Sequence, residues 1–234
     1  MDDPIFSQFA LEAAKIKEGG RWAALNLKIV AHAENATMGN EWWPKLLGSL
    51  CFQVFSEFLR LQNAYEQERT DPALLAWRAR NLLELSIWAT YVASSVENAR
   101  RFYEDAGRDA MECLQLFKNW GEKNDQPTDW LSVISVSQNN LSDQAASVGI
   151  TDLSGKYMSV LKAAEECGLK EAFSTWNKLL SKFAHPTAMQ ILGELNDKTN
   201  CIQKETFFGL GCCFFIGAFN AFETSQPVVG QKLS

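Results

Sequence analysis

The seventeen residues from Thr206 to Phe222, TFFGLGCCFFIGAFNAF, carry no charged side chain, and this run restricts the fold more than any other feature. As an α-helix it would be about 25 Å long, somewhat short of the roughly 20 residues that a membrane span needs. A helix without a polar face must be surrounded by lipid or by other helices. Asn220 and three glycines in the run favour the second arrangement. We therefore expect a buried central helix of a bundle, with a membrane anchor as the alternative.

Small side chains recur along this run at every fourth position, at Gly209, Cys213, Gly217 and Ala221. Residues four apart lie on the same face of a helix. A row of small side chains allows a neighbouring helix to approach closely. We therefore expect a large side chain at Gly217 to overpack a helix contact.

The rest of the chain has a helical period, interrupted by proline and glycine. The helices expected from this pattern cover residues 4–18, 21–35, 44–68, 73–120 with a break near 95–98, 154–167, 169–184, 187–196 and 199–223. Residues 130–149 are ambiguous, because LSVISVS alternates like a strand but the residues after it offer no hairpin partner; we interpret them as a weak helix. The chain is thus predicted to be all-α, a single bundle of about eight or nine helices. Residues 1–40 would pack on or extend from a core of residues 41–223, and residues 224–234 would form a frayed tail.

Composition narrows the functional classes. A net charge of −6 argues against a protein that coats nucleic acid, and there is no DNA-binding motif and no glycine-rich phosphate loop. The six cysteines have no CxxC spacing and no histidine nearby, so we expect reduced thiols, no metal site and no cofactor. The first residues, MDDPIFSQFA, are unlike a signal peptide. We therefore expect a cytoplasmic protein.

The segment WRARNLLELSIWATYVA is apolar almost all around the helical wheel, yet Arg80, Glu84 and Tyr91 lie near one stripe of it. Buried charges are costly unless they are paired. An arginine followed by a glutamate four residues later is the weaker orientation for a pair, so each group is expected to need a partner from another helix. One interpretation is an internal salt bridge that fixes helix register. The other is a polar pocket lined by these three side chains.

The next segment, ENARRFYEDAGRDAMECLQLF, carries oppositely charged residues four apart. Arg101 and Asp105 form one such pair, and Arg108 and Glu112 form another. This pattern is typical of a solvated helix face with salt bridges. The Glu-x-x-His pairs of a di-metal bundle are absent from the sequence, and His32 stands alone. We interpret His32 as a packing or surface residue.

His185 is followed directly by Pro186, which disfavours helical geometry for the residue before it. His185 should therefore lie at the carboxyl end of a helix, on the same side as Lys178, Ser181 and Lys182. That end of a helix favours a protonated imidazole. The position suits a general acid or base, and it equally suits a histidine that only caps the helix.

Two short motifs, RNLLE at residues 80–84 and SKFAHPTA at residues 181–188, are similar to those of a group of all-α bacterial and phage-borne proteins. These proteins resemble the HEPN superfamily, which includes ribonuclease toxins, abortive-infection factors and non-catalytic dimerising modules. Active members carry an arginine, four to six further residues and a histidine. Here Lys178 and His185 have the spacing, but lysine replaces the arginine, and the two are not equivalent in holding a phosphate.

The resemblance implies two functions. The first is an interaction module that forms a homodimer or binds a protein partner, and the lysine at position 178 and the acidic charge favour it. The second is a metal-independent ribonuclease that acts on RNA, in which His185 is the acid or base and Lys178, Lys182 or Arg80 stabilises the phosphorane charge. Whether the chain is an enzyme stays open at this point. A membrane-associated protein anchored by residues 206–222 is the third hypothesis.

Overall fold

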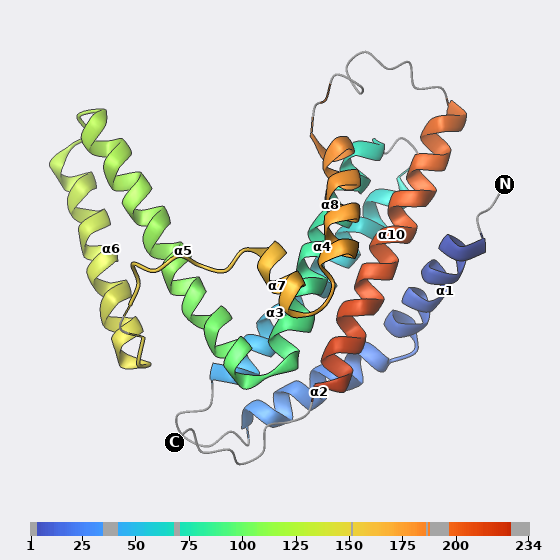
Figure 1. Cartoon of the computed structure of the whole chain (residues 1–234), viewed down its shortest axis with the longest axis horizontal. Helices are drawn as coiled ribbons and strands as arrows, with labels where there is room; N and C mark the ends of the chain where they lie inside the picture. The colour runs from blue at the N-terminus through green and yellow to red at the C-terminus, as the bar shows by residue number, and fades with distance from the viewer. Residues whose placement is uncertain are drawn as a thin grey trace. The chain divides into compact units, whose positions relative to one another are not determined.

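The computed structural model describes residues 4–34, 42–67, 71–150, 152–185, 187 and 197–225, and within these ranges all regular structure is α-helical (Figure 1). The predicted all-α class is therefore confirmed. The helices are α1 (Pro4–Glu18), α2 (Arg21–Glu34), α3 (Trp42–Glu66), α4 (Pro72–Ser94), α5 (Val96–Lys123), α6 (Thr128–Ser147), α7 (Val160–Glu166), α8 (Lys170–Ala184) and α10 (Asp197–Thr224).

The chain divides into two compact units. Met1–Val96 and Val160–Ser234 form the first, which we call the core unit, and Glu97–Ser159 form the second, which we call the hairpin unit. The sequence predicted one bundle over residues 41–223 and did not separate the core unit from the hairpin unit. Helices α1 and α2 belong to the core unit together with α3 and α4. Of the expected tail, residues 226–234 lie outside the described residues.

Helix α10 packs against α4, α1 and α3 within the core unit (Figure 1). Its large side chains supply much of the buried surface; Phe215 stacks on Phe58 with ring centroids 4.0 Å apart, and Phe219 is fully buried. Thr199–Thr224 is long and apolar enough to cross a membrane, with a mean hydropathy of 1.4, but 56% of the apolar window is buried inside the protein. The surrounding helices thus take the place that lipid would otherwise fill.

The close helix contacts of α10 are made at Gly209 and Gly211. A Cβ at Gly209 would lie 2.6 Å from Phe6 of α1, and one at Gly211 would collide with Leu61 of α3. Gly217, by contrast, is exposed, and a Cβ there would meet no atom within 4 Å. The expectation of overpacking at Gly217 is therefore wrong. The glycines in close contact are Gly209 and Gly211, which lie two residues apart and face α1 and α3 respectively.

Most helix ends lie where capping chemistry predicts them. Asp71 caps α4 by accepting a hydrogen bond from the Ala73 amide at 2.9 Å, and the long pattern after it breaks at Ser95 as expected. Residues 130–149 are mostly helical, since α6 ends at Ser147. The helix predicted for residues 154–167 is wrong over its first half, because only Val160–Glu166 is helical. The helix predicted for residues 187–196 lies outside the described residues apart from Thr187, which is not helical.

Candidate functional site

Arg80 and Glu84 form an ion pair on α4, with 2.7 Å between Arg80 Nη2 and Glu84 Oε1. Arg80 Nε also donates a hydrogen bond to Asn177 Oδ1 of α8 at 2.9 Å. The two side chains are 25% and 30% exposed. The expectation that both are buried and pair chiefly with other helices is therefore wrong, although Asn177 does link Arg80 to α8. Arg80 lies at the edge where α8 covers α4 and not in the dry centre of the core unit.

Tyr91, the third residue expected on this stripe, is fully buried. Its ring lies against Trp88, edge to face, with 6.1 Å between ring centroids. Seven residues separate it from Glu84, which is about 10 Å along a helix. The structure therefore brings Arg80 and Glu84 together and places Tyr91 in the core.

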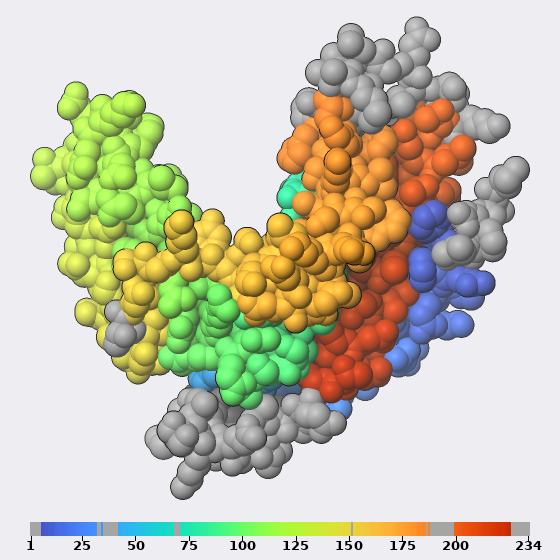
Figure 2. Space-filling view, in the orientation of Figure 1, coloured from blue at the N-terminus to red at the C-terminus, as the bar shows by residue number. Residues whose placement is uncertain are grey.

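On α8, Phe173 and Leu180 are buried, whereas Lys178, Lys182 and His185 are exposed. Figure 2 shows that part of α8 lies at the surface of the protein. Ser181 lies between these two sides and is partly exposed. His185 ends the helix in an extended conformation, with φ −118° and ψ 146°, so its predicted position is confirmed. The Thr187 hydroxyl donates to the Lys182 carbonyl oxygen at 3.3 Å and helps to close the helix end. The structure pairs neither Lys178 nor Lys182 with a carboxylate among the residues it describes.

His185 and Arg80 do not converge. Asn177, the α8 residue that binds Arg80, precedes His185 by eight residues, which is about 12 Å along the helix axis. A general base and a group that stabilises phosphorane charge must both reach the same phosphate. Of the predicted catalytic residues, only Lys178, Lys182 and His185 share one exposed stripe. Within the part of the chain that the structure describes, no group of three or more His, Cys, Asp or Glu side chains could hold a metal ion.

A buried carboxylate that the sequence reasoning missed links α3 to α4. Glu57 is 4% exposed and accepts hydrogen bonds from Arg78 Nη1 at 3.1 and 3.2 Å, from Arg60 Nη1 at 3.2 Å and from Asn81 Nδ2 at 3.2 Å. A buried charge held by three donors fixes the register of two helices more than it binds a ligand. Its position was visible in the sequence, because it lies on the stripe of Leu50, Val54 and Leu61.

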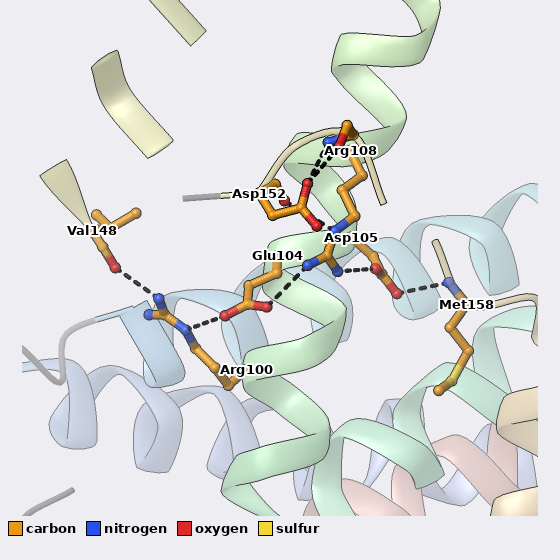
Figure 3. A network of polar contacts seen from close by, with 8 residues as sticks. Arg100, Glu104, Asp105, Arg108, Val148, Asp152 and Met158 are labelled. Carbon is orange, nitrogen blue, oxygen red and sulfur yellow. Dashed lines mark hydrogen bonds and ion pairs between the residues drawn. The ribbon is translucent and has the colours of Figure 1, made fainter. Parts of the chain in front are cut away.

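In the hairpin unit, a network of charged side chains holds residues 148–150 and 152–158 against α5 (Figure 3). Arg100 donates to the Val148 carbonyl oxygen at 2.8 Å and pairs with Glu104 at 3.0 Å. Arg108 donates to the Asp152 carbonyl oxygen at 3.2 Å. These bonds explain why the segment after α6 is an ordered loop and not the helix that its apolar residues suggest.

Asp105 is the buried centre of this network. It pairs with Arg108 Nη1 at 2.7 Å and accepts a hydrogen bond from the Met158 amide at 2.9 Å (Figure 3). The hydrogen bond with Asp105 raises the pKa of Arg108, and bonds from the Ser154 hydroxyl and amide lower the pKa of Asp152. The interpretation of this stretch as a solvated face is therefore wrong for Asp105, since the loop covers it.

The charged residues of α5 are confined to one side of the helix. At 100° per residue, every Asp, Glu, Lys and Arg of Val96–Lys123 falls in one half of the helical wheel. Residues of both halves contact α6: Trp120 and Trp130 lie edge to face at 5.8 Å, and Gln115 Oε1, in the charged half, accepts a hydrogen bond from Gln138 at 3.1 Å. The other half also carries a row of exposed residues spaced alternately four and three apart. This α5 seam consists of Ala106, Ala110, Cys113, Phe117 and Trp120.

Large apolar side chains beside the seam are exposed as well. Phe117 and Trp120 are 58% and 54% exposed, and Leu116, next to them on α5, is 61% exposed. On α6, Val133 and Val136 are 66% and 53% exposed. The helical wheel places Val133 on the same side of the α5–α6 hairpin as the seam, because Trp130 and Gln138 fix which side of α6 faces α5, whereas Val136 points away from α5. We call the seam with Leu116 and Val133 the hairpin face.

Sequence reasoning missed the hairpin face because it considered only the charged pairs of α5. The alternating four-and-three spacing of apolar residues was present in the sequence and could have identified it. What the sequence could not show was that neither α6 nor the loop covers this side.

Comparisons of the chain with protein-family models, with curated proteins and with solved structures find no match. The resemblance to HEPN proteins therefore rests on the two short motifs alone. The geometry of the described residues is what remains to support a function.

Proposed function

We propose that this chain is a protein-interaction module and that the hairpin face is its docking surface. The observation that carries the proposal is the exposure of four large apolar side chains, Leu116, Phe117, Trp120 and Val133, on one side of two helices. Together they present on the order of 500 Å² of apolar surface, from typical side-chain areas and their exposed fractions. Patches of that size on a protein surface commonly mark interaction sites.

The spacing of the α5 seam favours a helical partner. Apolar residues that alternate four and three apart repeat every 3.5 residues, the period at which two helices pack knobs into holes. Ala106 and Ala110 leave room for a second helix to approach the α5 backbone, and Phe117 and Trp120 supply large side chains to insert into it. Aromatic residues in the centre of an interface often dominate its binding energy.

Photo-crosslinking in cells tests the proposal. A benzophenone side chain in place of Phe117 should form adducts with a bound protein, whereas the same side chain in place of Glu112, on the charged half of α5, should form far fewer. Adducts from position 117 alone would support docking at the hairpin face. No adduct from position 117, or equal yields from the two positions, would contradict it.

A second candidate is a metal-independent ribonuclease centred on His185, favoured by the exposed stripe of Lys178, Lys182 and His185. His185 would remove the proton of a 2′-hydroxyl, which attacks the adjacent phosphate, while the lysines offset the phosphorane charge. Two features count against it: Arg80 is engaged by Glu84 and Asn177, and lysine stands where active HEPN members have arginine.

Incubation of the purified protein with total RNA in EDTA, beside a His185→Ala variant, separates the two functions. The interaction module predicts intact RNA with both proteins. Cleavage by the wild type that the variant lacks would favour the nuclease instead. The packing of α10 among α1, α3 and α4 supports either function over a membrane anchor.

A further inference from the structure

We propose that the hairpin face binds a second copy of this chain, with the two α5 helices antiparallel across a two-fold axis near Cys113. This inference rests on the proposed interaction function and names its partner. The α5 seam runs from small to large: Ala106 and Ala110 precede Cys113, and Phe117 and Trp120 follow it. The order of side-chain sizes along the seam determines which partner fits.

An antiparallel copy matches every small residue of the seam with a large one. With Cys113 on the axis, Ala106 opposes Trp120 of the second copy, and Ala110 opposes Leu116 of the second copy and lies within one residue, about 1.5 Å along the helix, of its Phe117. The reverse pairs follow by symmetry, as they must in a two-fold interface. Alternating large and small residues across an interface fills space at the density of a protein core. A parallel copy would set alanine against alanine and phenylalanine against phenylalanine, leaving a void at one end and a clash at the other.

The apolar area fits a dimer of this kind. A stable interface buries about 800 Å² per partner, of which roughly 60% is apolar. That apolar share is close to the order of 500 Å² that the four large side chains expose on each copy. Val133 widens the contact beyond α5, so the two hairpins together would form a four-helix arrangement.

The charge distribution also fits. On the helical wheel Asp109 lies between Leu116 and Trp120, at the rim of the hairpin face, and the other charged residues of α5 lie farther from the seam, so the centre of the contact would bury no ionised side chain of α5. The two hairpins would close on each other with no apolar seam left over, which limits the assembly to two copies. A partner of another sequence would not need the seam to be self-complementary.

The thiol of Cys113 provides the first test. In the full chain with Cys201→Ser, which removes the exposed cysteine of α10, a short bis-maleimide should link Cys113 to Cys113 of a second copy. Light scattering should show a mass that doubles with rising concentration, and Cys113→Ser should abolish the link without changing that mass. A monomer at all concentrations, with no link, would overturn the inference. Adducts from position 117 in cells would then still support docking of another protein.

Exchange of the large and small residues tests the register. Ala110→Phe should weaken the dimer at least tenfold because two large side chains would then oppose each other, and Phe117→Ala should weaken it similarly by leaving a void. The double variant restores one large and one small residue at each contact, so dimerisation should return to within about threefold of the wild type. Both positions are exposed in the single chain, so circular dichroism should show unchanged helix content. A dimer that neither single change weakens, or a double variant weaker than both, would contradict the antiparallel seam.

Discussion

Two identical substitutions in α10 should have opposite effects on stability. In Gly209→Ala the new Cβ would lie 2.6 Å from Phe6, whereas two carbon atoms in contact prefer about 3.5–4.0 Å. Overpacking of this kind costs about 1–3 kcal/mol, and replacing glycine by alanine within a helix returns about 0.5–1 kcal/mol. The net result should be a loss of up to about 2.5 kcal/mol. Gly217→Ala meets no atom within 4 Å, so only the gain of about 0.5–1 kcal/mol remains.

Urea unfolding followed by tryptophan fluorescence measures both changes, since Trp22 packs against Phe215 of α10. The helix-propensity gain is common to both variants, so their difference isolates the overpacking of about 1–3 kcal/mol. Phe6→Ala in the Gly209→Ala background should remove the collision, and its cost there should be smaller than in the wild type. Equal effects of the two glycine substitutions would refute the placement of α1 against Gly209.

Three further predictions concern polar groups of the core unit. Arg78→Met should lower the free energy of unfolding in urea by about 3 kcal/mol, because it weakens the pairing of buried Glu57. Arg60 is a more exposed partner of the same carboxylate, so Arg60→Met should lower the free energy of unfolding by less than about 1 kcal/mol. Equal losses would contradict this difference in burial. Arg80→Met should cost only about 1 kcal/mol because its ion pair is partly solvated, so a loss above about 3 kcal/mol would show a drier site. Burial raises the pKa of the Cys51 thiol to about 12, whereas a thiol in an unfolded chain has a pKa of about 8.5. The folded protein therefore holds this proton more tightly than the unfolded chain, and its stability should fall as the pH rises between these two values. Cys51→Ala should reduce that alkaline loss of melting temperature, and an unchanged slope would exclude the thiol as its cause.

The helix ends could be predicted because they depend on neighbours in sequence. Asp71 before Pro72, and the glycines at positions 19, 20 and 168, act through the local backbone, and Gly20 and Gly168 have positive φ angles of 74° and 71°. The loop before α7 could not be predicted in this way. Its amide at Met158 is bound by Asp105, 53 residues earlier, and no local pattern carries that contact.

The burial of individual side chains could not be predicted from the sequence either. The helix around Arg80 is apolar on nearly every side, yet α8 leaves Arg80 partly exposed. Glu57 lies on an equally apolar stripe, but it is almost fully buried because Arg78 and Asn81 approach it from α4. Periodicity indicates which side of a helix is apolar. It does not indicate how completely another helix covers that side, and the candidate sites depend on this coverage.

The place of α10 in the core unit has a consequence for synthesis on the ribosome. Helix α4 ends at Ser94, but α10, against which it packs, begins only at Asp197. At about 5–20 residues per second, roughly 5–20 s separate the two. The hairpin unit lies between them in the chain and can fold as it emerges, whereas the apolar sides of α4 that await α10 must stay uncovered for that time. The nascent core unit is therefore the part of this chain most in need of a chaperone, and it needs one until α10 has left the exit tunnel.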